Sequence, residues 1–170
     1  TIKPNILITG TPGTGKTVTS ENAAEAINFK YINIGNFVKD NECYEGKDDQ
    51  YDSYILDEDK LIDLLDPIIS LGGYIVDFHS CEIFPERWFD LILVLHSNTE
   101  ILYDRLIQRG YSTIKLNENM ECEIMQVVSE AARESYDSNI VYDLDSNTLD
   151  DLDSNVNRIK LWYENWKNAK

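Results

Sequence analysis

Gly10, Gly13, Gly15, Lys16 and Thr17 occur in the spacing G-x-x-x-x-G-K-[ST], the pattern of a phosphate-binding loop. The glycines let the backbone curl without Cβ clashes, so that successive N–H groups can point at phosphate oxygens. The Lys16 ammonium can reach the β- and γ-phosphates of a nucleoside triphosphate, and the Thr17 hydroxyl can ligate Mg²⁺. The alternative is a glycine-rich turn that happens to carry a lysine.

Such a loop functions only between a strand and a helix, and both flanking segments fit. Residues 5–9 are apolar and partly β-branched, which predicts a buried strand, and residues 18–27 predict a helix. The helix N-terminus adds free N–H groups and partial positive charge behind the loop.

Asp77 is the candidate second acid of the site. It ends an apolar strand predicted at 74–77, and a strand parallel to the first would bring this carboxylate near Thr17 and a metal. A capping aspartate at a strand end is the alternative. His79 could orient a water or a phosphate, or bond to Asp77, or serve only a structural purpose. His96 is interpreted as structural.

Arg105 and Arg109 lie four residues apart, so we expect them on one face of a helix predicted from Glu100 to about Gln108. They could close over phosphates as a clamp. The alternative is a solvated basic stripe that pairs with local acids such as Asp104. The chain has only five arginines, which makes two near a nucleotide site notable.

Predicted strands and helices alternate along the chain, which favours a single three-layer α/β domain around a parallel sheet. The segment 43–54 lacks an apolar period and is predicted to be exposed and mobile, either a substrate flap or a long loop. A polar hinge is predicted at 111–116, with Asn117 capping the next helix. The predicted strands are 5–9, 31–34, 74–77, 91–95 and 140–142.

Composition limits the kinds of protein to which this chain can belong. The 170 residues are 42% hydrophobic and contain no apolar run of the roughly 18 residues that a membrane span needs. The net charge of −16 argues against direct nucleic-acid binding and favours either a basic protein partner or plain solubility. Three cysteines, Cys43, Cys81 and Cys122, lie far apart and are predicted to be free thiols.

The guanine-binding pattern N/T-K-x-D and the switch pattern D-x-x-G of GTP-binding proteins are absent from the sequence, which leaves a small kinase or ATPase. Among small kinases and ATPases, the chain resembles the adenylate kinase isoenzyme 6 family, also called the coilin-interacting nuclear ATPase family. The resemblance runs over nearly the whole chain, and its most discriminating parts are Pro85-Glu86-Arg87-Trp88 and Arg109-Gly110-Tyr111. The other matching segments are Pro4–Leu7, 10–17, Tyr31–Asn33, Ile55–Asp59, Val76–His79, Leu102–Leu106, Cys122–Ile124, Trp162 and Trp166.

The resemblance implies a P-loop nucleoside monophosphate kinase fold with a five-stranded parallel sheet of order 2-3-1-4-5. It implies one kinase domain over 1–170, with a monophosphate-binding region at about 33–56 and a lid at about 108–118. It also implies transfer of the ATP γ-phosphate to AMP to give ADP, with ATP hydrolysis as a second activity. A role in small ribosomal subunit maturation, a basic small-subunit ribosomal protein as partner, and a nuclear and cytoplasmic location follow in the same way. We expect a monomer.

The resemblance also implies roles for single residues. The phosphate loop would hold the phosphates of ATP, Arg109 would cover them, and Thr148 would contact the adenine. AMP would be bound by Asn33, Lys39 and Arg87. Asp77 and His79 would form the acidic-strand motif. Arg87, Arg105 and Arg109 would neutralise charge on AMP and on the moving phosphoryl group, and Mg²⁺ would lie between Thr17 and Asp77. The loop residues are Gly13, Thr14, Gly15, Lys16, Thr17 and Val18.

Two positions depart from the family pattern. Val18 stands where many members have a second Thr, which preserves a backbone contact but removes a hydroxyl. Lys39 stands where Arg is usual and cannot make a bidentate fork. The alternative function is an assembly ATPase that binds a basic ribosomal protein, with weak or no AMP kinase activity.

Overall fold

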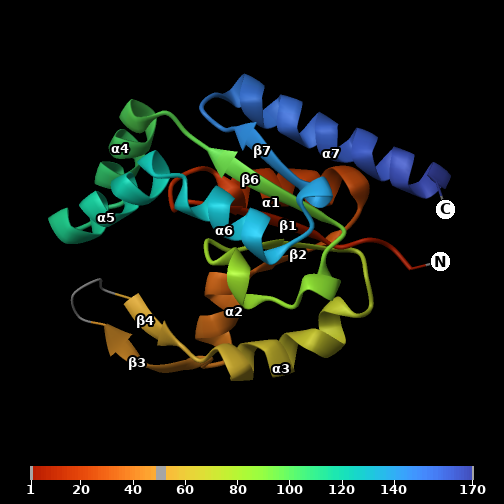
Figure 1. The fold of residues 1–170 in the computed structure, drawn as a ribbon, viewed down its shortest axis with the longest axis horizontal. Coiled ribbons are helices and arrows are strands. Elements are labelled where there is room, and N and C mark those ends of the chain that lie inside the picture. Colours follow the sequence, from red (N-terminus) through yellow and green to blue (C-terminus); the bar gives the residue numbers. More distant parts are fainter. Residues whose placement is uncertain (1, 49–52, 170) are drawn as a thin grey trace.

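The computed structural model describes residues 2–48 and 53–169. Its centre is a five-stranded sheet in the order β2-β5-β1-β6-β7, with every neighbouring pair parallel (Figure 1). Numbered within this sheet alone, the order is 2-3-1-4-5, so the expected topology is confirmed. The strands are β1 (Ile6–Gly10), β2 (Lys30–Asn33), β5 (Tyr74–Asp77), β6 (Leu91–His96) and β7 (Val141–Asp145).

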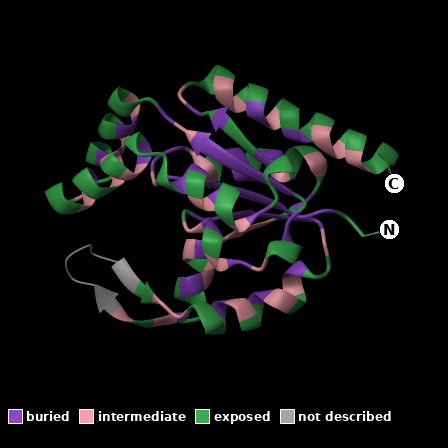
Figure 2. Cartoon of the chain, in the orientation of Figure 1, coloured by how far each residue is buried: buried purple, intermediate pink, exposed green. Residues whose placement is uncertain are grey.

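Helices cover both faces of the sheet, because successive strand side chains point to opposite sides. Ile6 and Ile8 pack in one buried cluster with α1 (Lys16–Ile27) and α7 (Leu149–Ala169). Leu7, between them, packs in the other cluster with α3 (Glu58–Ile69) and α6 (Val127–Ser135). Figure 2 shows the buried residues concentrated in the central strands. The predicted three-layer α/β architecture is confirmed.

The strand register brings the polar strand ends to one edge of the sheet. Ile8 of β1 lies beside Asp77 of β5, and Asp77 lies beside Asn33 of β2. The phosphate loop leaves β1 at this same edge and enters α1. The remaining helices are α2 (Ile34–Asp40), α4 (Thr99–Gln108), α5 (Thr113–Ile124) and the short 3-10 turns η1 (Cys81–Ile83), η2 (Glu86–Trp88) and η3 (Ser138–Ile140).

Two sequence-based predictions of local structure are wrong. The segment 43–54 is not only an irregular loop, because β3 (Tyr44–Asp48) and β4 (Ser53–Leu56) pair antiparallel in a separate two-stranded sheet; residues 49–52 lie outside the described residues. The helix predicted to begin at Asn117 begins at Thr113, because the Ser112 side chain accepts a hydrogen bond from the Lys115 N–H. Most of the predicted hinge is therefore helical.

Two expectations from the composition concern free cysteines and membrane-spanning helices. Cys43, Cys81 and Cys122 are free, as predicted. Across 2–48 and 53–169, none of the helices has both the length and the apolar character required to cross a membrane.

Candidate active site

The phosphate-binding loop connects β1 to α1 in the predicted way. The helix begins at Lys16, with Gly15 as N-cap in the left-handed conformation (φ 87°), so its first N–H groups lack intrahelical partners and can bind an anion. Gly13 has φ +95°, and a Cβ there would lie 2.8 Å from Leu102 Cδ1 of α4. Both backbone conformation and packing therefore require glycine at position 13.

Lys16 turns back over the loop that carries it. Its ammonium donates hydrogen bonds to the carbonyl oxygens of Gly10 at 3.0 Å and Thr11 at 3.2 Å. Desolvation, opposed in part by the charge of Asp77, lowers the pKa of Lys16 to about 8. A neighbouring phosphate would favour the protonated form, so the residue is suited to hold an anionic group at the loop.

Asp77 and Thr17 lie together at the mouth of the loop, as predicted. The Thr17 hydroxyl lies 3.4 Å from Asp77 Oδ2, and the Tyr31 hydroxyl donates a hydrogen bond to the same carboxylate. Asn33 Nδ2 lies 3.2 Å from the Tyr31 oxygen. Asp77 is buried, and desolvation raises its pKa, while its hydrogen bond to Tyr31 acts in the opposite direction.

The donor set fits Mg²⁺ better than a metal held by protein ligands alone. Within 2–48 and 53–169 there is no group of three or more His, Cys, Asp or Glu placed to hold a metal. Thr17 and Asp77 instead offer two hard oxygen atoms beside the phosphate loop. Mg²⁺ is commonly bound by one or two protein oxygens together with substrate phosphates and water.

Two clefts meet at the phosphate loop. A cleft of about 530 Å³ lies between the loop, the end of α4 and the turn before α7; a cleft of about 560 Å³ lies between the loop, α2, the end of β5 and the start of α5. Gly13, Gly15 and Arg109 line both clefts. The first also contains Val18 and Thr148, and the second contains Lys16, Thr17, Asn33, Lys39, Asp77 and His79.

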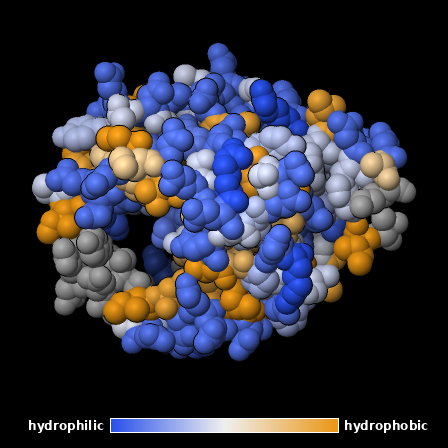
Figure 3. Space-filling model, viewed as in Figure 1, coloured by the Kyte–Doolittle hydropathy of each residue, from blue (hydrophilic) through white to orange (hydrophobic). Residues whose placement is uncertain are grey.

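Basic side chains are concentrated in these clefts. Of the 15 lysines and arginines in the chain, five line the clefts, whereas only two of the 31 acidic residues are found among the lining residues that the structure describes. The face in Figure 3 is largely hydrophilic. Such a local excess of positive charge indicates an anionic ligand. The five are Lys16, Lys39, Arg105, Arg109 and Lys115.

Arg105 lines the first cleft, and its guanidinium is hydrogen-bonded to protein oxygens there. Its guanidinium donates to the carbonyls of Gly13, Ser146 and Asn147 and to the Ser97 hydroxyl, at 3.0 to 3.1 Å. These contacts tie α4 to the loop and to the turn after β7. The side chain is thereby turned toward protein oxygens, so Arg105 positions the loop and Arg109 remains the arginine that faces both clefts.

Arg87 does not lie at the site, and its predicted contact with substrate is wrong. Its guanidinium pairs with Asp66 at 2.9 Å, and both side chains are substantially exposed. The adjacent Trp88 carbonyl accepts a hydrogen bond from Asn5 Nδ2 at 3.1 Å, and Asn5 directly precedes β1. Arg87 therefore lies at the amino-terminal edge of the sheet, opposite the phosphate loop.

His79 is exposed in the second cleft, with its ring centroid 4.4 Å from that of Phe78. Partial desolvation and the charges of Lys16 and Lys115 lower its pKa, so the imidazole is neutral at pH 7. His96, interpreted as structural, is confirmed in that role by its contacts with Glu123 and Asp143.

Sequence comparison relates the chain to known proteins. Residues 6–126 match the AAA domain family. An adenylate kinase isoenzyme 6 homolog of Dictyostelium discoideum is 49% identical over 164 residues, which cover 96% of this chain and 94% of that protein. The chain belongs to the adenylate kinase isoenzyme 6 family. The homolog FAP7 of Saccharomyces cerevisiae is 48% identical over 164 residues, covering 96% of this chain and 83% of its own.

Solved structures agree on the fold. Shikimate kinase from Acinetobacter baumannii has a TM-score of 0.67 at 12% identity, covering 96% of this chain and 94% of its own. Shikimate kinase from Bacteroides thetaiotaomicron has a TM-score of 0.65 at 14% identity, covering 95% and 98%. This adenylate kinase isoenzyme 6 family member is thus a nucleotide kinase with the P-loop kinase fold.

Sequence reasoning missed two residues at the site of this family member. Tyr31 bonds to Asp77, and its place two residues before Asn33 on the strand beside β5 was the available signal. Lys115 lines the second cleft, and its ammonium lies 4.3 Å from the centre of the Tyr111 ring. It was missed because the segment was interpreted as a hinge rather than as the first turn of α5.

Proposed function

We propose that this protein transfers the γ-phosphoryl group of ATP to AMP and forms two molecules of ADP. The observation that carries the proposal is the meeting of two clefts at one phosphate loop, with Arg109 lining both. A phosphoryl group passed from one nucleotide to another must cross such a junction, and a cation there can stabilise its charge throughout the transfer.

We assign the donor nucleotide to the first cleft. Val18, whose side chain is 51% exposed, and Leu149, at 80%, offer apolar surface for a base, and Thr148 lies beside them. The loop N–H groups and Lys16 would hold the phosphates. Thr17 and Asp77 would hold Mg²⁺, which supplies charge neutralisation on the phosphates when it is bound.

We assign the acceptor to the second cleft and to the region of about 33–56. Asn33 and Lys39 line this cleft beside Asp77. Lys39 is exposed, so its ammonium is available to an acceptor phosphate as a point charge. Tyr31, which donates a hydrogen bond to Asp77 and accepts one from Asn33, would keep that carboxylate oriented toward the loop.

The segment of about 108–118 serves as the lid in this proposal. Gly110 has φ +75° and open space around its Cα, while Arg109, Tyr111 and Lys115 on either side line the second cleft. Movement about this glycine would bring Arg109 and Lys115 over the phosphates and exclude water. Incomplete closure would let water accept the phosphoryl group, so we expect slow ATP hydrolysis as a second activity.

The test measures ADP formed from ATP and AMP with Mg²⁺, compared with ATP alone. Turnover that rises at least tenfold with AMP and is lost in Lys16→Ala supports the proposal. Hydrolysis of ATP at the same rate with and without AMP would contradict it. Nucleotide binding by wild type, measured separately, shows that the preparation is competent.

A second function is favoured by the charge distribution. The net charge is −16 although five basic residues lie inside the clefts, so the outer surface is strongly acidic. We propose that this surface binds a basic small-subunit ribosomal protein during subunit maturation, in the nucleus and the cytoplasm, under control of the bound nucleotide. Pull-down of small-subunit ribosomal proteins with ATP, with ADP and without nucleotide tests this. Equal absence of any basic partner in all three would refute it.

A further inference from the structure

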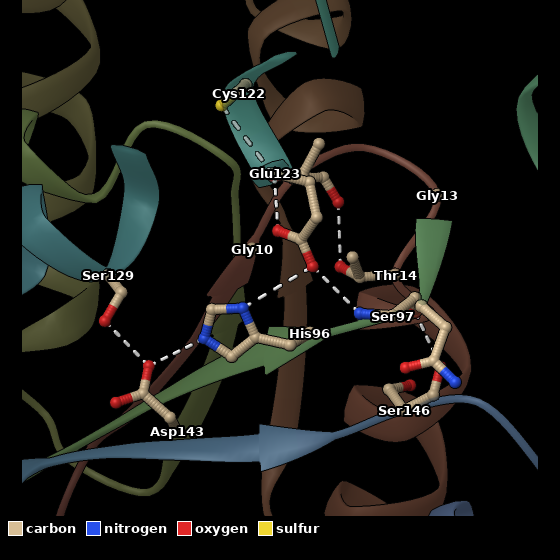
Figure 4. Close-up of polar contacts among 12 residues, drawn as sticks. Gly10, Gly13, Thr14, His96, Ser97, Cys122, Glu123, Ser129, Asp143 and Ser146 are labelled. Carbon is tan, nitrogen blue, oxygen red and sulfur yellow. Dashed lines mark hydrogen bonds and ion pairs between the residues drawn. The ribbon is translucent and has the colours of Figure 1, made fainter. Parts of the chain in front are cut away.

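The carboxylate of Glu123 lies close to His96, Ser97 and the phosphate loop (Figure 4). Glu123, in the last turn of α5, is 7% exposed. One of its oxygens accepts a hydrogen bond of 2.9 Å from the Thr11 hydroxyl, and the other accepts one of 2.9 Å from the Ser97 N–H. Glu123 therefore joins the helix α5 to the loop and to the end of β6.

The charge of Glu123 is balanced by His96. His96 Nδ1 lies 3.4 Å from the Glu123 carboxylate, and Nε2 lies 2.7 Å from Asp143 Oδ1. Asp143 is in turn bonded to the Ser129 hydroxyl at 2.8 Å and paired with Arg133. An isolated buried carboxylate is costly, and this set of partners allows it to remain ionised.

The ionisation states follow from the same contacts. The pKa of His96 is raised to about 9, chiefly by its hydrogen bond to Glu123 and also by the neighbouring Asp143. Burial acts in the opposite direction. Desolvation would raise the pKa of Glu123, but its hydrogen bonds to His96, Ser97 and Thr11 outweigh this effect and lower it. At pH 7 the pair is therefore imidazolium and carboxylate, and the Thr11 hydroxyl donates to a charged acceptor, which makes a stronger hydrogen bond than a neutral one.

Thr11 links Glu123 to the residues that bind phosphate. Its carbonyl oxygen accepts hydrogen bonds from the Thr14 N–H at 3.2 Å, the Thr14 hydroxyl at 2.7 Å and the Lys16 ammonium at 3.2 Å. The side chain of Thr11 is thus held by Glu123, while its backbone holds Thr14 and Lys16. A shift of Thr11 would displace the turn that shapes the loop.

We propose that Glu123 is a positioning residue for the phosphate-binding loop, which fixes Thr11 from beneath and thereby sets the affinity for the triphosphate of ATP. It touches no substrate in this arrangement; it acts through Thr11 on the loop groups that do. Because α5 also carries Lys115 into the second cleft, the same helix connects the loop anchor to the lid.

The experiment measures the dissociation constant of Mg-ATP by calorimetry, without AMP, so that its outcome does not depend on kinase activity. Glu123→Gln preserves the shape of the side chain and removes its charge. We expect the dissociation constant to rise about tenfold. Glu121→Gln is the matched control, because it removes the same charge from an exposed position on the same helix, and we expect a change below twofold. Glu123→Gln binding within twofold of wild type would overturn the proposal.

The loop side of the contact gives an independent test. Thr11→Val removes the hydroxyl, whereas Thr11→Ser retains it, so we expect weakened ATP binding in the first and near wild-type binding in the second. The double variant Thr11→Val with Glu123→Gln should bind no more weakly than the weaker single variant, because both remove one interaction. Additive losses, or equal affinity in Thr11→Val and Thr11→Ser, would contradict the proposal. If Glu123→Gln does not fold, the two Thr11 variants decide it alone.

Discussion

Arg105 donates a hydrogen bond of 3.0 Å to the Gly13 carbonyl and so fastens α4 to the phosphate-binding loop. Arg109, four residues later, is exposed and lines both clefts. These two arginines on one helix thus have separate roles, because the Arg105 guanidinium is bonded mainly to backbone oxygens, whereas Arg109 lines both clefts.

Removal of each arginine should have a distinct signature. We expect Arg109→Ala to lower the turnover number by about 10²- to 10³-fold, the range for loss of one donor to developing charge, with the free energy of unfolding changed by less than about 0.5 kcal/mol. Arg105→Ala should instead lower that free energy by about 2 kcal/mol or more, because a charged donor to four oxygens is lost. Urea unfolding and steady-state kinetics check both. The reverse pattern would exchange the two assignments.

Arg87→Ala tests the corrected position of that residue. The Arg87–Asp66 pair is on the surface, with side chains 63% and 38% exposed. We expect a loss of about 0–1 kcal/mol in stability and Michaelis constants for ATP and AMP within twofold of wild type. A tenfold rise in the Michaelis constant for AMP would return Arg87 to the acceptor site.

Lys39→Arg tests the acceptor cleft. Lys39 lines this cleft and is exposed, so a longer guanidinium has room to bind a phosphate through two parallel hydrogen bonds. We expect the Michaelis constant for AMP to fall by about three- to tenfold, since one additional charge-assisted hydrogen bond contributes on the order of 1 kcal/mol. The dissociation constant of ATP should stay unchanged. An effect on ATP alone would move Lys39 to the donor side.

His96 gives the protein a defined pH dependence of stability. Its pKa is raised to about 9 in the folded protein, from 6.5 in the unfolded chain, by Glu123 and Asp143. The stabilisation is therefore complete below pH 6.5 and is lost as the pH rises through 9. We expect the difference in free energy of unfolding between wild type and His96→Gln to shrink by on the order of 3 kcal/mol between pH 6 and pH 10. Parallel stability curves across this range would contradict the assigned ion pairs.

The sequence predicted the parts of the site that depend on local patterns. The glycine spacing, Lys16, Thr17 and the strand ending in Asp77 were placed correctly, because each follows from its own neighbours and from parallel strand ends meeting at one edge. The pairing of β3 with β4 was missed because β3 carries three charged residues, neither strand shows apolar alternation, and the pair is separate from the main sheet.

Long-range contacts account for the remaining differences. Nothing near Glu123 in the chain signals a partner 112 positions away in Thr11, and nothing near Arg105 signals the Gly13 carbonyl 92 positions away. Arg87 was placed by its motif, whereas the hydrogen bond from Asn5 to the carbonyl of the adjacent Trp88 holds this turn at the opposite edge of the sheet. Residue type singled out the two arginines, but only the tertiary structure determines what each side chain contacts.

The contrast between basic clefts and an acidic exterior has a kinetic consequence. ATP is itself an anion, so in dilute buffer, where the Debye length is about 30 Å at 0.01 M salt, an approaching ATP meets the repulsive field of a molecule with net charge −16. Only inside the clefts, where the five basic side chains dominate, does the attraction take over. Added salt should therefore accelerate ATP association from low ionic strength, the opposite of electrostatic steering, and should also accelerate dissociation. The protein would then exchange nucleotide faster at the ionic strength of a cell than in dilute buffer.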